Sequence, residues 1–209
     1  MIAVVARLHL SQLFNRIKLV VTNPKLCWDT IASESATPRD LIGSLLLPLL
    51  LLGAACTILG LQVFGVHITY LGTWHPPLFE QIVDRLVRVV ATIGTVFLCS
   101  MALKNLATNL GGRNDMNRAF SLLAHSMIPA ALSSIFAVIP LLGRGSFLFL
   151  AVFSIYVLYQ GCSKMLDIPD NQRITFVVSA VAVMILFSTV FAWLSWFVWS
   201  STPPGTLVM

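Results

Sequence analysis

The chain has 209 residues, of which 57% are hydrophobic and 10% are charged, and its formal net charge is +5. Soluble domains carry about 25% charged residues, so this composition excludes an ordinary soluble globular protein. The apolar residues also lack the alternation that the strands of a membrane β-barrel require. The sequence therefore predicts an all-α membrane protein, whose backbone hydrogen bonds are satisfied within helices.

Residues 1–40 form the one sizeable segment outside the apolar stretches, ahead of a predicted membrane domain at 41–200 and a short external tail at 201–209. Apolar residues recur at helical spacing between residues 3 and 21, with basic residues such as Arg16 among them, which predicts an amphipathic helix. Two placements fit this cytoplasmic segment. The helix lies on the membrane surface with its cations near anionic lipid, or it packs across the ends of the bundle.

Two residues after this helix predict how it ends. Pro24 has no backbone N–H and is expected to terminate the helix. Trp28 is expected at the membrane interface, because an amphipathic indole ring favours the headgroup layer. A new helix is predicted to start after Thr37, which has the residue type of an N-cap, with Pro38 in the first turn and Asp40 three residues beyond the cap.

Five long apolar stretches predict five membrane-spanning helices. A helix needs about 20 mostly apolar residues to cross a hydrocarbon core of about 30 Å. The stretches cover residues 41–66, 89–103, 119–142, 147–159 and 174–199. The second and fourth are short, so their helices are expected to extend beyond them. The predicted fold is a polytopic bundle of five transmembrane helices.

Individual residues in the first two spans predict local features. Pro48 removes one backbone hydrogen bond and is expected to kink the first span. Gly53 and Gly60 offer small surfaces for close contact with another helix. At the start of the second span, Asp84 and Arg88 are four residues apart and can pair on one helix face.

The third and fourth spans are predicted to form an antiparallel hairpin. The third span contains His125 and Pro129, and residues 140–145 are rich in proline and glycine, which predicts a tight outer turn after it. The fourth span is expected to end at Gly161.

The basic residues predict the orientation of the chain. Of the 13 Lys and Arg residues, all but Arg85, Arg88 and Arg144 fall on one side of the predicted spans. The positive-inside rule then places the N-terminus in the cytoplasm and the C-terminus outside. Three tryptophans within residues 193–199 agree with an outer interface there. The net positive charge is therefore a topology signal, and no nucleic-acid partner is expected.

Several short motifs follow one another along the chain in a recognisable order. They are Leu-Gly-Gly at 110–112, His-Ser-Met-Ile-Pro at 125–129, Ile-Pro-Leu-Leu-Gly at 139–143 and Tyr-Val-Leu-Tyr-Gln-Gly at 156–161. Upstream, Asn-Pro at 23–24 precedes Trp28 and Ile31. In their order and spacing these motifs resemble the Yip1-domain family of small five-span membrane proteins.

The resemblance implies five spans with a cytoplasmic N-terminus and an external C-terminus, as the charge pattern also predicts. Eukaryotic members of the family are associated with Rab GTPases and early secretory traffic. A forty-residue N-terminal segment leaves little room for a GTPase-docking domain, so the chain is more similar to the bacterial branch. The expected location is the bacterial inner membrane, with the C-terminus in the periplasm. His125 departs from the family, in which a less ionisable residue, often tyrosine, is expected.

The residues that could carry chemistry each have two interpretations. His125 lies deep in the third span, where it serves as a proton relay or as a neutral side chain. The neutral side chain would bond a carbonyl freed near Pro129 or a neighbouring helix. Lys104, Gly111 and Gly112 form a polar inner end of the second span. This end binds anionic headgroups or a partner, or it simply terminates the helix.

No metal, cofactor or enzymatic activity is expected. His67, His75, Glu80 and Asp84 include competent metal ligands, but their spacing matches no established metal motif. The sequence contains neither the G-x-S-x-G nor the H-E-x-x-H pattern of catalytic sites.

The expected function is that of a non-enzymatic integral membrane scaffold or organiser of the Yip1 type, which binds membrane lipids, a partner membrane protein or another copy of itself. The alternative is a small transporter or channel for protons, ions or a small solute. Such a protein would use His125 and the spans that are broken at Pro48 and Pro129.

Overall fold

The computed structural model describes residues 15–200 except 21, 35 and 69–71. Within this part of the chain, five helical segments are long and apolar enough to cross a membrane, which confirms the predicted all-α bundle. The segments are Pro38–Phe64, Leu78–Asn109, Met116–Phe136, Gly145–Leu166 and Asp170–Trp193.

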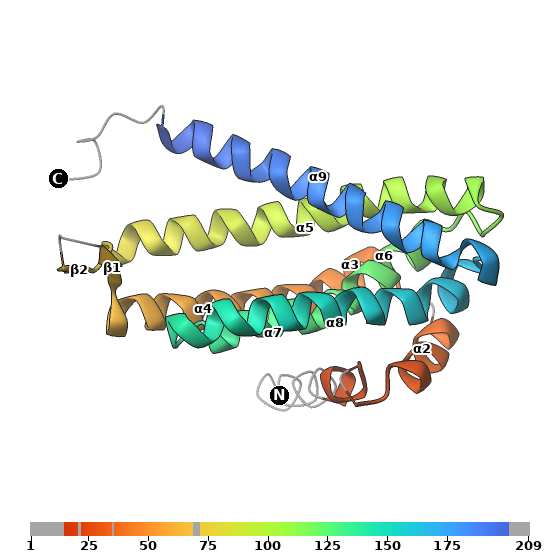
Figure 1. Ribbon diagram of the computed structural model, residues 1–209, viewed down its shortest axis with the longest axis horizontal. Helices are drawn as coiled ribbons and strands as arrows, with labels where there is room; N and C mark the ends of the chain where they lie inside the picture. Colours follow the sequence, from red (N-terminus) through yellow and green to blue (C-terminus); the bar gives the residue numbers. More distant parts are fainter. Residues whose placement is uncertain (1–14, 21, 35, 69–71, 201–209) are drawn as a thin grey trace.

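The long helices lie in two groups (Figure 1). One group contains α5 (Leu78–Asn109) and α9 (Arg173–Ser200), and the other contains α4 (Leu47–Phe64), α7 (Ile128–Phe136) and α8 (Pro140–Leu166). In Figure 1 α9 lies close to α5 and α8 at one end and diverges from α8 toward the other end.

The two ends of the bundle differ in structure and charge. At one end, β1 (Val66–Ile68) and β2 (Gly72–Trp74) pair as a short antiparallel hairpin within the predicted outer loop. We call this the hairpin end. The opposite end, which we call the basic end, has the basic residues of the inner loops and helix termini: Lys104, Arg113, Arg118, Lys164 and Arg173.

The first span starts at the predicted cap. Thr37 Oγ1 accepts a hydrogen bond from the Asp40 N–H at 3.3 Å, and the Asp40 carboxylate accepts one from the Thr37 N–H at 3.1 Å. This capping box begins α3 (Pro38–Leu41), which leads into a π-helical turn, Ile42–Leu46, and then into α4. Pro48 cannot donate to the carbonyl four residues earlier, and the wider turn directly before it absorbs that irregularity.

The second span, α5, extends beyond its apolar run at both ends, as predicted. It has 32 residues, which gives a length of about 48 Å at 1.5 Å per residue. A hydrocarbon core is only about 30 Å thick. The helix therefore crosses the core with several turns to spare, and its polar residues from Glu80 to Arg88 lie in the part nearest the hairpin end.

The third span is broken near its middle. It consists of α6 (Met116–Ser126) and α7, with Met127 between them and Pro129 in the first turn of α7. The chain then turns at residues 137–139.

The predicted limits of the fourth span are wrong at both ends. Residues 140–145 are not a tight turn but the start of α8, with Pro140 in its first turn. Proline suits that position because the N–H it lacks would have no partner there. At its other end α8 continues past Gly161 to Leu166. A short 3-10 turn, Asp170–Gln172, then leads into α9.

The N-terminal segment also differs from the prediction. Residues 15–20 are helical, and residues 3–14 of the predicted amphipathic helix lie outside the described residues. The helical residues before Pro24 end at Thr22, as predicted. A second helix, α2 (Pro24–Ser33), then starts at Pro24, and the Asn23 side chain accepts a hydrogen bond from the Leu26 N–H at 3.5 Å.

The core is centred on α6. Its Phe120, Leu122 and Leu123 are completely buried, and α6 packs between α5 and α8. In the most apolar part of the third span 61% of the residues are buried, against 17% in the fifth span. Most of the packing therefore lies around α6 at the basic end, and α9 is peripheral.

Candidate functional site

An N-terminal strap, which we define as residues 15–20 and α2, lies against the bundle at the basic end. Trp28 of α2 is 1% exposed, and its indole Nε1–H donates to the Val157 carbonyl of α8 at 3.1 Å. Asp29 of α2 forms an ion pair with Lys164 of α8 at 2.5 Å on the surface. The Trp28 indole is therefore enclosed by protein, and its depth relative to the membrane interface stays a prediction.

Gly161 makes room for Trp28. A Cβ atom at Gly161 would lie 2.5 Å from the Cζ2 atom of Trp28 and 2.6 Å from Leu122 Cδ1, distances that real Cβ atoms do not reach. The absence of a side chain at Gly161 lets the indole pack against the α8 backbone. Trp28 and Val157, whose hydrogen bond joins α2 to α8, are 129 residues apart in the sequence.

His125 lies beneath the strap and is completely buried. Its Nδ1 is 2.8 Å from the Ser121 carbonyl oxygen, and its Nε2 is 3.2 Å from the Arg16 Nη1. A carbonyl can only accept and a guanidinium can only donate. Both bonds therefore require the neutral imidazole with its proton on Nδ1. Trp28 packs against the same ring edge-on, with 6.2 Å between the ring centroids.

Arg16 connects this buried ring to the surface. Its Nη2 donates to the Glu34 carboxylate at 2.5 Å, and both side chains of this ion pair are about one-third exposed. Glu34, Arg16 and His125 thus form a continuous chain of polar contacts from solvent to the core. Of the two placements that fit the N-terminal sequence, the described part of the segment takes the second, packed on the bundle.

A polar cavity of about 300 Å³ lies beside this network at the basic end. Its walls include Glu34 from the chain after α2, Arg113 and Asp115 from the loop before α6, and Arg118 and Ser121 from α6. Ser121 is the residue whose carbonyl holds His125, so this cavity adjoins the histidine on its basic-end side.

A larger apolar groove of about 520 Å³ lies on the other side of His125, between α8 and α9. Ser126 and Met127 line it at the break between α6 and α7. Further along, Phe147 of α8 and Thr189 of α9 line the part nearer the hairpin end. His125 therefore lies between a polar cavity and an apolar groove. Ser121, one helical turn before it, lines the cavity, and Ser126, the next residue, lines the groove.

The sequence model of the Yip1 domain matches residues 18–199. The chain belongs to the Yip1 domain family. No curated protein and no solved structure matches it. The match includes Trp28, Gly161 and His125, while Arg16 lies two residues before its start.

Gly111 and Gly112 close the end of α5 in this Yip1 domain. Gly111 has φ = +81°, and the Gly112 N–H donates to the Ala107 carbonyl at 2.7 Å while the Gly111 N–H donates to Thr108 at 3.2 Å. This is the Schellman pattern of helix termination. A Cβ at Gly112 would lie 2.6 Å from the Leu166 carbonyl, so the glycine also permits close packing against the end of α8. Both observations favour the structural interpretation of these glycines.

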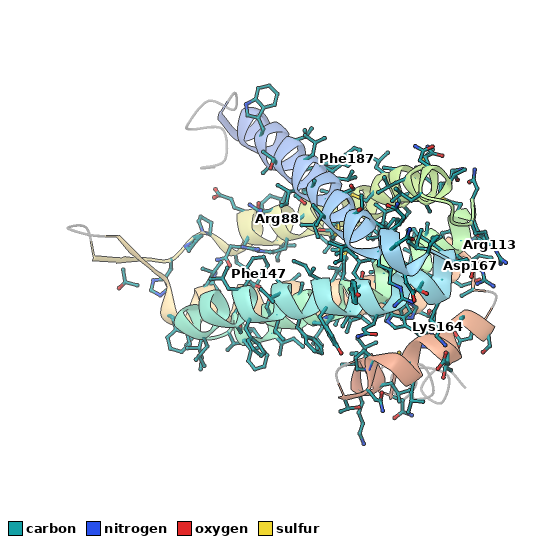
Figure 2. The ribbon with its side chains drawn as sticks, turned by 45° about the vertical axis from the view of Figure 1, so that its right-hand side comes forward. Arg88, Arg113, Phe147, Lys164, Asp167 and Phe187 are labelled. Carbon is teal, nitrogen blue, oxygen red and sulfur yellow. The ribbon has the colours of Figure 1, made fainter. Side chains whose placement is uncertain are left out.

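The next residue fastens the same corner of the Yip1 domain. The Arg113 N–H donates to the Leu166 carbonyl at 2.8 Å, and the Arg113 guanidinium pairs with Asp167 at 3.2 Å. Figure 2 shows Arg113 and Asp167 side by side at the basic end. Lys104 lies on α5 nearly two turns before Gly111, and its side chain is half-buried.

Asp84 and Arg88 form the predicted pair at the opposite end of the Yip1 domain. The Arg88 Nε donates to both Asp84 carboxylate oxygens, at 3.0 and 2.9 Å. The pair lies near the hairpin end of α5, so the structure does not bring it together with His125. Among the described side chains, which exclude that of His67, no three His, Cys, Asp or Glu residues gather as a metal site.

The residues that sequence reasoning missed are those of the strap. The sequence leaves open whether Arg16 lies on lipid or on the bundle and indicates no role for Glu34, although together they reach His125. A usable signal was present in the family motifs themselves, because a glycine inside a long apolar helix, Gly161, can accommodate a large ring such as that of Trp28.

Proposed function

We propose that this Yip1 protein is a non-enzymatic scaffold or organiser of the bacterial inner membrane, which binds partner proteins or lipid through the hairpin-end halves of α8 and α9. Its N-terminus lies in the cytoplasm and its C-terminus in the periplasm. The observation that carries the proposal is the large apolar surface that these two neighbouring helices leave uncovered.

On α8 the uncovered side chains are large and adjacent. Leu148 is 70% exposed and Phe149 is 74% exposed. On α9, Ile185 and Leu186 near the middle of the helix are each 61% exposed. Nearer the basic end exposed residues such as Val178, at 63%, alternate with the buried Phe176 and Ala180. Lipid covers any membrane-facing helix, but a peripheral helix that packs mainly at one end has surface available for association with another helix.

His125 supports a non-enzymatic role. Both of its ring nitrogens already contact protein groups, and the ring is completely buried. A general acid or base must reach a substrate proton within hydrogen-bond distance. His125 in this arrangement has neither a free nitrogen nor an open path to one.

The charge distribution supports the proposed orientation. The basic end collects Arg and Lys residues from three separate parts of the chain, among them Arg113, Lys164 and Arg173. Positively charged loops are retained on the cytoplasmic side of bacterial membranes. A reporter fused to each terminus tests this orientation: the N-terminal fusion should respond only to cytoplasmic reagents and the C-terminal fusion only to periplasmic ones.

Site-specific photo-cross-linking in native membranes tests the scaffold. A photoreactive residue replaces Leu148 on α8 or Leu186 on α9, and a matched control replaces Val90 on α5, which is 70% exposed. We expect discrete protein adducts or homodimers from the α8 and α9 positions and not from Val90. Monomer alone at all three positions would overturn the role of α8 and α9 as a protein-binding surface.

One observation favours the second candidate function, a small proton, ion or solute transporter. His125 is flanked along α6 by Ser121, which lines the polar cavity, and by Ser126, which lines the apolar groove. Movement of the strap would connect these spaces through the histidine. The test is flux through proteoliposomes under an imposed gradient. Flux that is lost in His125→Ala and increased in Arg16→Ala would support transport, and tight vesicles for all ions tested would exclude it.

A further inference from the structure

The groove between α8 and α9 has a length and volume that restrict its occupant. It extends along α8 from Phe147 to Leu158, a distance of about 16 Å at the helical rise. Its volume is about 520 Å³. A groove of this length and volume accommodates a hydrocarbon chain, whose carbons pack at about 4 Å.

Two of the four hydroxyl side chains that line the groove donate to backbone carbonyls of their own helices. Ser126 donates to the Leu123 carbonyl at 3.0 Å, and Thr189 donates to the Ile185 carbonyl at 2.8 Å. Ser154 accepts from the Ala130 N–H at 3.0 Å, next to the break between α6 and α7. A hydroxyl whose proton is held by a backbone carbonyl does not require a polar ligand. These contacts leave a lining that suits a saturated chain.

The hairpin end of the groove faces a positive charge on α5. Gly94 on α5 lies beside Phe191 on α9, two residues beyond the groove-lining Thr189. Arg88 is six residues from Gly94, about 9 Å further toward the hairpin end. In Figure 2 Arg88 on α5 and Phe147 on α8 lie opposite each other, across the space from which α9 diverges.

Two guanidinium groups share one carboxylate at this position. Asp84 accepts from Arg88 Nε and lies 3.6 Å from Arg85 Nε. The Arg85 Nε is buried and makes no hydrogen bond to any described residue. Glu80, the next acidic residue, is eight residues from Arg88, about 12 Å further from the groove. The cluster of Asp84, Arg85 and Arg88 thus has a net charge of +1, with guanidinium donors available for an anion.

We propose that the groove binds one acyl chain of an anionic phospholipid, with the phosphate held by Arg85 and Arg88. An amphiphile of this kind matches both features: an apolar groove and a cationic cluster toward one end of it. The inference rests on the proposed function in that it names a lipid ligand for the surface formed by α8 and α9. In the proposed orientation the lipid belongs to the periplasmic leaflet.

The experiment uses the full chain in vesicles of phosphatidylcholine with a minor fraction of phosphatidylglycerol that has a photoreactive acyl chain. Mass spectrometry locates the labelled residues. We expect labelling concentrated on groove residues such as Ala151 and Ile185, and about tenfold less when the same photoreactive chain is on phosphatidylcholine. Labelling spread evenly over all membrane-facing helices would overturn the proposal, as would equal labelling by the two lipids.

Variants separate the two parts of the site. Ala151→Phe places a ring in the groove and should abolish groove labelling, whereas Val152→Phe is the matched control because Val152 is 67% exposed on the same helix and does not line the groove. Arg85→Gln with Arg88→Gln should abolish the preference for phosphatidylglycerol while the groove remains open. Unchanged labelling in Ala151→Phe would contradict the proposal.

A parallel measurement distinguishes this inference from the scaffold role. Protein cross-linking from Leu148 and Leu186 is repeated in the Ala151→Phe background, and helical content by circular dichroism confirms that each variant is folded. Protein adducts that persist while lipid labelling is lost would mean that lipid and partner bind separately. Lipid labelling confined to the groove without any protein adduct would support the lipid site and would exclude a protein partner at this surface.

Discussion

The indole of Trp28 packs directly on the Cα atom of Gly161, where any side chain would collide with the ring. This contact joins the strap to α8 and is reinforced by the hydrogen bond from Trp28 Nε1 to Val157. We predict that Gly161→Ala displaces the strap and costs about 1–3 kcal/mol, the usual penalty for overpacking. Thermal unfolding in detergent, followed by circular dichroism, measures the loss.

The control for this substitution lies on the same helix. A Cβ at Gly145 would have no atom within 4 Å, and the residue is exposed. Gly145→Ala should therefore leave the unfolding temperature unchanged or raise it, because alanine is the better helix former. Equal losses in both variants would show that the Trp28 contact is not the cause.

The contact between Arg16 and His125 predicts a measurable coupling. Each side chain satisfies the other, so truncation of one leaves a buried polar atom without its partner. We expect Arg16→Ala and His125→Phe each to destabilise the protein. The double variant should lose less than the sum, with a coupling free energy of about 0.5–3 kcal/mol in a double-mutant cycle. Additive losses would mean that the two side chains do not act as a pair.

Cys27 reports on the strap through its thiol chemistry. Burial raises the pKa of the Cys27 thiol to about 11, from 9.0. Because the thiolate is the reactive form, we predict that Cys27 in the folded protein is alkylated about 100-fold more slowly at neutral pH than in the unfolded chain. Other cysteines are replaced first, so that Cys27 alone is measured. Gly161→Ala, which displaces the strap, should accelerate alkylation by exposing the thiol.

The same pKa shift has a defined sign for stability. The folded state holds the Cys27 proton more tightly than the unfolded state, so it binds more protons between pH 9 and 11. The stabilising contribution is complete below pH 9 and is lost as the pH rises toward 11. Cys27→Ala should remove this decline from the pH dependence of unfolding, and a decline that persists would assign it to another group.

Gly60 sets the distance between α4 and α7. A Cβ at Gly60 would lie 2.5 Å from the Ala137 carbonyl and 2.7 Å from the Val138 carbonyl, and backbone atoms cannot move aside cheaply. We predict that Gly60→Val lowers stability by more than about 2 kcal/mol. Gly43→Val is the control because a Cβ at Gly43 would have no atom within 4 Å. Urea or thermal unfolding of both variants provides the comparison.

At Gly111 the backbone conformation, rather than the space around the residue, limits which side chains can be accommodated. Its φ of +81° is unfavourable for residues with a Cβ, and asparagine tolerates such a conformation better than alanine. We expect Gly111→Ala to cost about 1–2 kcal/mol and Gly111→Asn clearly less. The unfolding midpoints of the two variants give the order of these losses. A larger loss in Gly111→Asn than in Gly111→Ala would contradict a backbone origin.

The sequence was sufficient for features that depend on neighbouring residues. The capping box of Thr37 and Asp40, the pair of Asp84 and Arg88, and the helix end at Gly111 all involve partners within a few residues. Helical periodicity brings such partners together whatever the rest of the chain does. The five spans could likewise be predicted from the sequence, because composition alone determines which segments favour lipid.

Features that depend on distant partners were predicted wrongly or not at all. A tryptophan that follows a proline, as Trp28 does, is compatible with a membrane interface. Its burial against α8 is possible only because Gly161 leaves room for the ring. Pro140 is predicted to lie in a turn, although proline is equally suited to the first helical turn in which the structure has it. The Yip1 motifs identify the family, but they do not predict which motifs contact one another in the folded protein.

The separation of 129 residues between Trp28 and Val157 has a consequence for biosynthesis. A ribosome adds about 5–20 residues per second, so Val157 is made roughly 6 to 26 seconds after Trp28. During that interval the strap has neither Val157 nor Gly161 to dock on, and its tryptophan and arginine are available to the membrane surface or to a chaperone. Docking of the strap is thus a late step, and it marks a chain whose fourth span has already been inserted.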